Sequence, residues 1–128
     1  MEALEALKDL KVLYVEDEEI TREAVGYIIR RKASEVRTAK NGEEGWVIYQ
    51  TFEPDVVITD LEMPVMNGLE MMRRIRELKK DQPVVILTAF EDEAHMCAGA
   101  DVVLVKPIEK HRLIEAIVQA SGRQSTKS

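Results

Sequence analysis

The chain has 128 residues, which is enough for one domain that buries its own hydrophobic core. Hydrophobic residues make up 45% and charged residues 33% of it, a balance that is typical of a folded globular protein and excludes general disorder. The formal net charge of −6 argues against nucleic acid or an anionic membrane as the main partner, and a single cysteine excludes an internal disulfide or a cysteine-based zinc site.

The chain shows no targeting or membrane-spanning pattern. No apolar run approaches the length of a membrane span, and Met1–Leu10 lacks the features of a signal peptide. We therefore expect a cytoplasmic protein that binds neither membranes nor nucleic acids. We expect a leading segment or short helix at residues 1–9, one domain at residues 10–120, and a disordered polar tail at residues 121–128.

The expected elements alternate between strands and helices along the chain. Short aliphatic runs predict strands at residues 10–15, 35–39, 56–58, 83–87 and 102–105. Apolar residues at helical spacing predict helices at residues 20–31, from 43 to just before Pro54, at 68–80 and at 110–120. This alternation predicts an α/β fold with a doubly wound parallel sheet and right-handed crossovers.

The spacing of apolar residues predicts that the first helix is amphipathic and which residues of the third helix point inward. In the first helix Ile20, Ala24 and Ile28 recur every four residues. In the third helix the predicted inward residues are Leu69, Met72, Ile75 and Leu78. The basic residues of that helix are interpreted as a solvent-exposed face: Arg73, Arg74, Arg76, Lys79 and Lys80.

The most informative stretch is Asp55–Gly68, which reads DVVITDLEMPVMNG. Val56–Ile58 is apolar on both faces, as in a strand buried inside a parallel sheet. After Asp60, the pairs Met63-Pro64 and Asn67-Gly68 force the backbone to turn. A carboxylate at this point lies at the carboxyl edge of the sheet, where open α/β sheets bind their ligands. Taken alone, however, such an Asp most simply caps a turn.

Asp60 does not stand alone, because four predicted strands end in polar residues: Glu16-Asp17, Asp60, Thr88 and Lys106. The carboxyl ends of parallel strands gather at one edge, and three carboxylates there repel unless a cation lies among them. Oxygen ligands of this kind suit Mg²⁺. A Lys and a Thr hydroxyl would bind phosphoryl oxygens, and an Asp beside a metal is a competent nucleophile. The residues themselves therefore predict that Asp60 accepts a phosphoryl group.

Five short motifs occur in order on the expected elements. They are VEDE (15–18), VVITDLEMPVMNG (56–68), LTA (87–89), GAD (99–101) and VKP (105–107). Each motif alone is weak, but in this order they resemble a response-regulator receiver domain of the chemotaxis type, from two-component signalling. The resemblance covers about residues 10–119.

The resemblance implies a flavodoxin-like fold with strand order 2-1-3-4-5. It implies that Asp60 receives phosphate from a histidine kinase or a histidine phosphotransfer protein and relays its state to an unknown downstream protein. Such a protein is not an enzyme: it catalyses only its own phosphorylation and slow dephosphorylation.

The resemblance also implies a Mg²⁺ site beside Asp60. Asp17 would bind the ion directly, and Glu16 would reach it mainly through water. The backbone carbonyl of Glu62 would be the third protein ligand.

Further residues receive roles toward the phosphoryl group. Thr88 would donate a hydrogen bond to it, Lys106 would pair with it, and the Lys106–Pro107 peptide would be cis. Glu62 and Phe90 each lie two residues beyond a site residue and would tune the lifetime of the phosphoryl group, Glu62 by orienting water and Phe90 by shielding the bond.

Two features depart from the family pattern. Ten residues separate Thr88 from Gly99, about one helical turn fewer than usual, so the fourth helix must be short, displaced or partly unwound. The switch position, often Tyr or Phe, is Val103, which lacks a ring that could swing between buried and exposed positions. We expect a domain that accepts phosphate but signals through another surface or with a muted change.

Two alternative functions stay open. A phosphatase of the haloacid-dehalogenase type also uses an Asp nucleophile after a strand, but it requires a second Asp where this chain has Glu62. A receiver-like docking module that takes no phosphate is favoured by Val103 and the short fourth helix, and disfavoured by the intact Asp17, Asp60, Thr88 and Lys106.

Overall fold

The computed structural model describes residues 7–122, whose strands form one parallel sheet. The strand order is β2-β1-β3-β4-β5, which confirms the predicted flavodoxin-like doubly wound fold. The strands are β1 (Lys11–Val15), β2 (Glu35–Ala39), β3 (Val56–Asp60), β4 (Val84–Thr88) and β5 (Val102–Val105).

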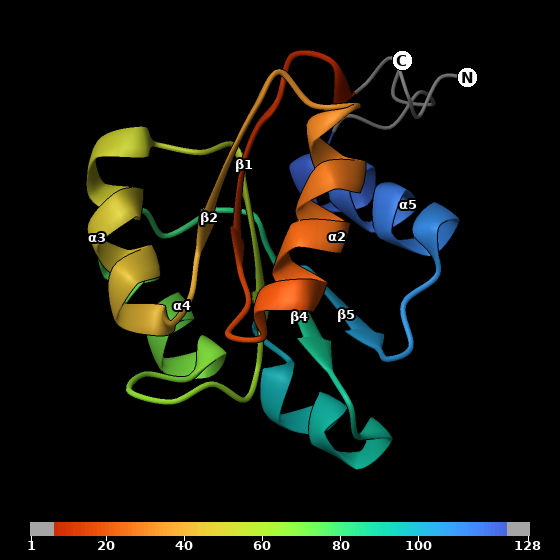
Figure 1. The fold of residues 1–128 in the computed structure, drawn as a ribbon. Coiled ribbons are helices and arrows are strands. Elements are labelled where there is room, and N and C mark those ends of the chain that lie inside the picture. The colour runs from red at the N-terminus through yellow and green to blue at the C-terminus, as the bar shows by residue number, and fades with distance from the viewer. Residues whose placement is uncertain (1–6, 123–128) are drawn as a thin grey trace.

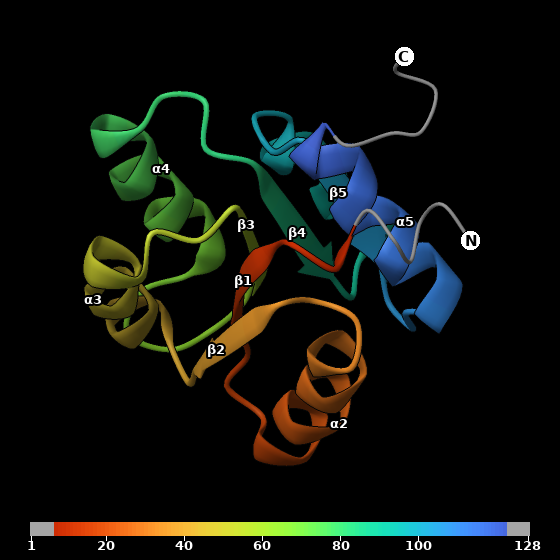
Figure 2. The ribbon, with the colours of Figure 1, turned by 90° about the horizontal axis from the view of Figure 1, so that it is seen from above.

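Helices cover both faces of the sheet. They are α2 (Glu19–Arg30), α3 (Gly42–Phe52), α4 (Gly68–Leu78), the 3₁₀ helix η1 (Glu91–Cys97) and α5 (Lys110–Ser121). Figures 1 and 2 show α3 and α4 on one side of the sheet and α2 and α5 on the other. The expectation of a shortened fourth helix is confirmed, because the connection between β4 and β5 is the seven-residue 3₁₀ helix η1.

Alternate residues of the strands pack into two separate hydrophobic cores. In β1, Val12 and Tyr14 pack into the core under α2 and α5. Leu13 and Val15 pack into the core under α3 and α4. Because helices cover both faces of the sheet, the central strands β3 and β4 are buried at every position, whereas the edge strand β2 exposes Glu35 and Arg37.

Two asparagines fix the starts of α3 and α4. The side chain of Asn41 accepts a hydrogen bond from the Glu44 N–H at 2.8 Å, and that of Asn67 accepts one from the Glu70 N–H at 2.8 Å. Both are N-caps that satisfy a backbone donor of the first turn. The cap at Asn67 starts α4 a few residues after the end of β3, where the predicted site lies.

The predicted amphipathic helix α2 is present, but its buried face is not the row of apolar residues that predicted it. Ile20 is 77% exposed and Ala24 is exposed, whereas Ile29 is buried and Val25 packs against the same core. Val25 and Ile29 also lie four residues apart, so the spacing alone could not choose between the two rows. In α4 the prediction fails at Leu78, which is 64% exposed because the last turn of the helix extends past the core.

Arg76 is also an exception to the predicted solvent-exposed basic face of α4. Its guanidinium donates to the Gln82 carbonyl oxygen at 2.9 Å and 3.1 Å and to Asp101 Oδ2 at 2.9 Å, and it bonds the Gly99 carbonyl oxygen. Asp101 Oδ2 accepts a further bond from the Val84 N–H at 2.8 Å. Arg76 therefore ties α4 to the starts of β4 and β5.

The packed unit reaches both ends of the described chain. Leu7 is fully buried in the core under α2 and α5, and α5 includes Ser121, the first residue of the predicted tail. The rest of the leading segment (1–6) and of the tail (123–128) lies outside the described residues. From residue 7 to residue 122, no helix is long and apolar enough to cross a bilayer.

Candidate functional site

Three carboxylates lie together at the carboxyl edge of the sheet. Glu16 and Asp17 follow β1, and Asp60 is the last residue of β3. One carboxylate oxygen from each lies within 4.8 Å of the other two. Glu16 and Asp60 are 2% and 5% exposed, whereas Asp17 is exposed. The parallel pairing of β1 with β3 brings these residues together.

Glu16 is held from several directions. Its Oε1 accepts a hydrogen bond of 3.4 Å from the buried Tyr14 hydroxyl and lies 3.7 Å from Lys106 Nζ. Its Oε2 accepts a bond from the Glu18 N–H at 3.1 Å, and Arg22 donates to its carbonyl oxygen at 2.9 Å. Burial, reinforced by the charge of Glu16, raises the pKa of Tyr14, so the phenol stays a donor. From sequence, Tyr14 and Arg22 are ordinary strand and helix residues, and neither is predicted as part of the site.

Lys106 reaches Asp60 from the end of β5. Its Nζ donates to Asp60 Oδ2 at 3.1 Å and lies 2.9 Å from Oδ1. Burial lowers the pKa of Lys106, but Asp60 and Glu16 raise it by more, so the net pKa lies above its usual value and the amine stays charged.

The carboxyl group of Asp60 lies in a place that disfavours its charge. Burial is the main cause that raises the pKa of Asp60 to about 7. The neighbouring Glu16 also raises this pKa, and the hydrogen bond from Lys106 lowers it by too little to offset these effects. Oδ1 is buried, and although Lys106 Nζ is near, no described residue donates a hydrogen bond to it. A buried oxygen without a donor is rare in native proteins and leaves a lone pair open to a ligand.

The first residue of α4 packs directly against the backbone of Asp60. A Cβ atom at Gly68 would lie 2.2 Å from the Asp60 carbonyl oxygen, so only glycine permits this approach. The Gly68 N–H donates to the Leu61 carbonyl oxygen at 2.8 Å. The pair Asn67-Gly68, predicted as a turn, therefore caps α4 and fixes the backbone that carries Asp60.

Thr88 ends β4 at the same edge, but its hydroxyl is engaged elsewhere. The hydroxyl donates to Glu93 Oε1 at 2.8 Å and accepts from the Phe90 N–H at 3.2 Å. Within the described chain, no hydrogen bond joins Thr88 to Asp60. Glu93 is not predicted from sequence, where the acidic run 91–93 indicates only a helix start. Its position five residues after the end of β4, within an acidic run, was the available signal.

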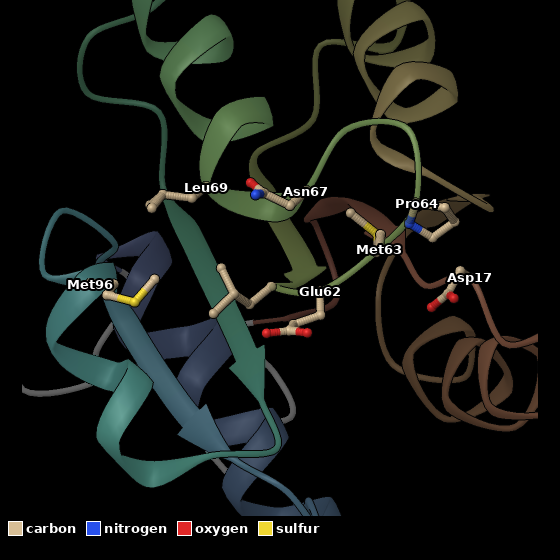
Figure 3. Close-up of a pocket in the computed structure, with 8 residues that line it drawn as sticks. Asp17, Glu62, Met63, Pro64, Asn67, Leu69 and Met96 are labelled. Carbon is tan, nitrogen blue, oxygen red and sulfur yellow. The ribbon is translucent and has the colours of Figure 1, made fainter.

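A pocket opens beside the carboxylates (Figure 3). In this view Glu62, just after β3, lies between Asp17 and the Met96 of η1. Hydrogen bonding to the Glu93 carboxyl group, and the charge of that group, raise the pKa of Glu62. Other lining residues are Leu61, Met63, Pro64, Asn67 and Leu69.

The remaining predicted positions lie around this edge. Val103 is partly buried and packs against the core under α3 and α4, while Phe90 is 55% exposed. The Lys106–Pro107 peptide is cis. Since Val103 is small and packed inward, the swing of a large ring between buried and exposed positions is not available there.

A family model described as the response regulator receiver domain matches residues 12–118. The transcriptional regulatory protein AfsQ1 of Streptomyces coelicolor is 34% identical over 125 residues, covering 91% of this chain and 55% of that protein. The chemotaxis protein CheY of Halobacterium salinarum is 31% identical, covering 84% of this chain and 92% of that one. The chain spans about half the length of AfsQ1 and of two further regulators that it matches.

A solved structure shows the same fold. The response regulator TrrA of Thermotoga maritima, in complex with Mg²⁺-BeF, superposes with a TM-score of 0.80 at 33% identity, covering 86% of this chain and 97% of that one. The region that the family model matches contains every site residue described above, from Tyr14 to Lys106.

Proposed function

Because the chain belongs to the response regulator receiver-domain family of two-component signal transduction, we propose that Asp60 takes a phosphoryl group from a histidine kinase or a histidine phosphotransfer protein. The observation that carries this proposal is the state of Asp60 itself. Its buried Oδ1 accepts no hydrogen bond from the described residues, and the Lys106 ammonium lies 2.9 Å away. A carboxylate with an open lone pair beside a cation is suited to attack phosphorus.

The proposed transfer is a direct displacement. A carboxylate oxygen of Asp60 attacks the phosphorus of a phosphohistidine, so that the O–P bond forms as the P–N bond breaks. The imidazole leaves with the electron pair and takes a proton from solvent. Lys106 would offset the charge of the phosphoryl oxygens, and Thr88 would donate a hydrogen bond to one of them.

The donor set at the site fits Mg²⁺. Its donors are carboxylate oxygens, among them Oδ1 of Asp60, which accepts no hydrogen bond from the described residues, and Mg²⁺ prefers such hard oxygen ligands. We propose that Asp17 binds the ion directly, that Glu16 contributes mainly through water, and that the Glu62 backbone carbonyl is a further ligand. When bound, Mg²⁺ would supply positive charge opposite Asp60 and the phosphoryl oxygens. The complex of the related TrrA with Mg²⁺-BeF supports this assignment.

Receiver domains are generally signalling modules without enzymatic activity on other molecules. We propose that this chain catalyses only its own phosphorylation and slow dephosphorylation, and that the phosphorylated form binds a downstream protein in the cytoplasm. The net charge of −6 supports a protein partner over nucleic acid or an anionic membrane.

Two residues near the acceptor would set how long the phosphoryl group lasts. Glu62 carries a carboxyl group that would orient an attacking water molecule, and the exposed ring of Phe90 would shield the acyl phosphate. Substituting them should therefore change the dephosphorylation rate in opposite directions, with Glu62→Gln slowing it and Phe90→Ala speeding it.

The test is incubation with acetyl phosphate and Mg²⁺ followed by intact-mass measurement. We expect a gain of one phosphoryl group that disappears with EDTA and is absent in Asp60→Asn. A protein that gains no phosphoryl group, from acetyl phosphate or from a phosphorylated histidine protein, would contradict the proposal and favour a docking module that takes no phosphate.

A further inference from the structure

The hydroxyl of Thr88 already forms a hydrogen bond with a side chain of η1 in this structure. It donates to Glu93 Oε1 at 2.8 Å, and the other carbonyl within reach, that of Phe90, lies at the 3.5 Å limit of a hydrogen bond. A hydroxyl has one proton and makes one strong donor bond at a time. Glu93 therefore competes with any other acceptor that needs the Thr88 proton.

The proposed function creates such an acceptor. A phosphoryl group on Asp60 replaces the carboxylate charge with a phosphoryl charge of about −1.5 to −2, and it places three strong acceptor oxygens at the edge where Thr88 lies. The Glu93 carboxylate would lose the Thr88 proton to one of these oxygens. The phosphoryl charge would also repel the Glu93 carboxylate. Glu93 is close to this edge of the sheet, because its carboxyl group lies beside that of Glu62, two residues beyond Asp60.

Little else holds the first turn of η1 in place. The helix has no side-chain cap, and Cys97, its last residue, is its one buried residue. Phe90 and Met96 are 55% and 56% exposed. A 3₁₀ helix of seven residues is also longer than the three or four that are usual, so it depends on contacts outside itself. Among the described residues, Thr88 anchors the first turn through its hydrogen bond to Glu93, whose carboxyl group also meets that of the exposed Glu62.

We infer that Glu93 is a positioning residue that holds η1 against Thr88 while Asp60 is unphosphorylated, and that phosphorylation of Asp60 releases η1. This inference rests on the proposed function. The hydrogen bond of Thr88 passes from the Glu93 carboxylate to a phosphoryl oxygen, and no covalent bond beyond the acyl phosphate changes. The released element is η1 itself, so the signal does not require an aromatic ring at position 103.

The chain carries its own reporter for this release. Cys97 is the single cysteine, and its thiol is buried at the end of η1, with Sγ 3.7 Å from the Glu93 carbonyl oxygen. A pulse of N-ethylmaleimide in the presence of acetyl phosphate and Mg²⁺ labels the thiol only when η1 opens. One intact-mass spectrum then reports both the phosphoryl group and the maleimide adduct on each molecule.

We expect phosphorylated wild-type molecules to be labelled about fivefold faster than unphosphorylated ones, which corresponds to the loss of one hydrogen bond. Glu93→Ala should raise the rate of unphosphorylated molecules by a similar factor and remove most of the difference. Glu93→Gln keeps an acceptor oxygen and should retain slow labelling. Glu91→Ala, an exposed acidic residue of the same helix, is the matched control and should behave as wild type.

Equal labelling of phosphorylated and unphosphorylated wild-type molecules would overturn the inference while leaving the proposed function intact. Slow labelling of unphosphorylated Glu93→Ala would also overturn the inference and leave the proposed function intact. A wild-type protein that gains no phosphoryl group in this spectrum would overturn both. A merely structural role of Glu93 would raise labelling in both forms of the variant and leave the difference between them as in wild type.

Discussion

Asp60 is an ionisable residue in a position that favours its neutral form. Its pKa rises from 3.8 to about 7 on folding, chiefly through burial. The folded state therefore binds the proton of this carboxyl group more tightly than the unfolded state does. The contribution of this carboxyl group to stability is fully present below about pH 4 and is lost as the pH rises through about 7.

Asp60→Asn should therefore stabilise the metal-free protein, because asparagine resembles the protonated acid. In EDTA we expect the free energy of unfolding to rise by up to about 4 kcal/mol at about pH 8, and the gain to shrink as the pH falls toward about 4. Urea unfolding at a series of pH values measures this. The exposed Asp81→Asn is the control and should show little effect. A gain that is independent of pH would contradict the account.

Val65 is a second residue in an unfavourable conformation, in the loop that follows Asp60. Its φ of 72° lies in the left-handed region, which costs an L-residue roughly 1–2 kcal/mol. The side chain is 72% exposed, so its removal loses little burial. Val65→Gly should raise the free energy of unfolding by about 0.5–1 kcal/mol after the entropy cost of glycine. Val65→Ala retains Cβ and should change little, and destabilisation by glycine in urea unfolding would refute the prediction.

At the scale of elements, side-chain spacing predicted the helices well and their inner faces less well. In α5 the apolar residues at helical spacing are all buried: Leu113, Ile114, Ile117 and Val118. In α2 two rows share the same four-residue spacing, and which one faces inward depends on how the helix packs on the sheet. The prediction for Arg76 failed for a related reason. Its partners are two backbone carbonyls, which carry no signal in a sequence, and Asp101, which is 25 residues away along the chain.

Arg76→Met should loosen the junction of α4 with β4 and β5. It removes the bonds to the Gln82 and Gly99 carbonyl oxygens and to Asp101, and it should lower the free energy of unfolding by about 2 kcal/mol. The matched control is Arg74→Met on the same helix, whose exposed pair with Glu70 at 3.8 Å is worth about 0.5 kcal/mol or less. Equal effects of the two variants in chemical unfolding would show that Arg76 is an ordinary surface residue.

At the scale of the whole molecule, the alternation of elements predicted a parallel sheet and the residues that converge at its carboxyl edge. The strand order came from the resemblance to receiver domains. Glu16, Asp17, Asp60, Thr88 and Lys106 all occupy strand ends, and parallel pairing leaves such residues one common edge. Which hydrogen bonds they form there was not predictable. The bond from Thr88 to Glu93 depends on how the short η1 packs against β4. The geometry at Asp60 Oδ1 depends on where the flexible Lys106 side chain lies.

The central claim is that Asp60 is the phosphoacceptor, and the most direct measurement locates the phosphoryl group. After incubation with acetyl phosphate and Mg²⁺, borohydride reduces an aspartyl phosphate to homoserine, which peptide mass spectrometry then assigns to a position. The account predicts homoserine at position 60, dependent on Mg²⁺ and absent in Asp60→Asn. Homoserine at another carboxylate, such as Asp17, or none at all, would contradict it.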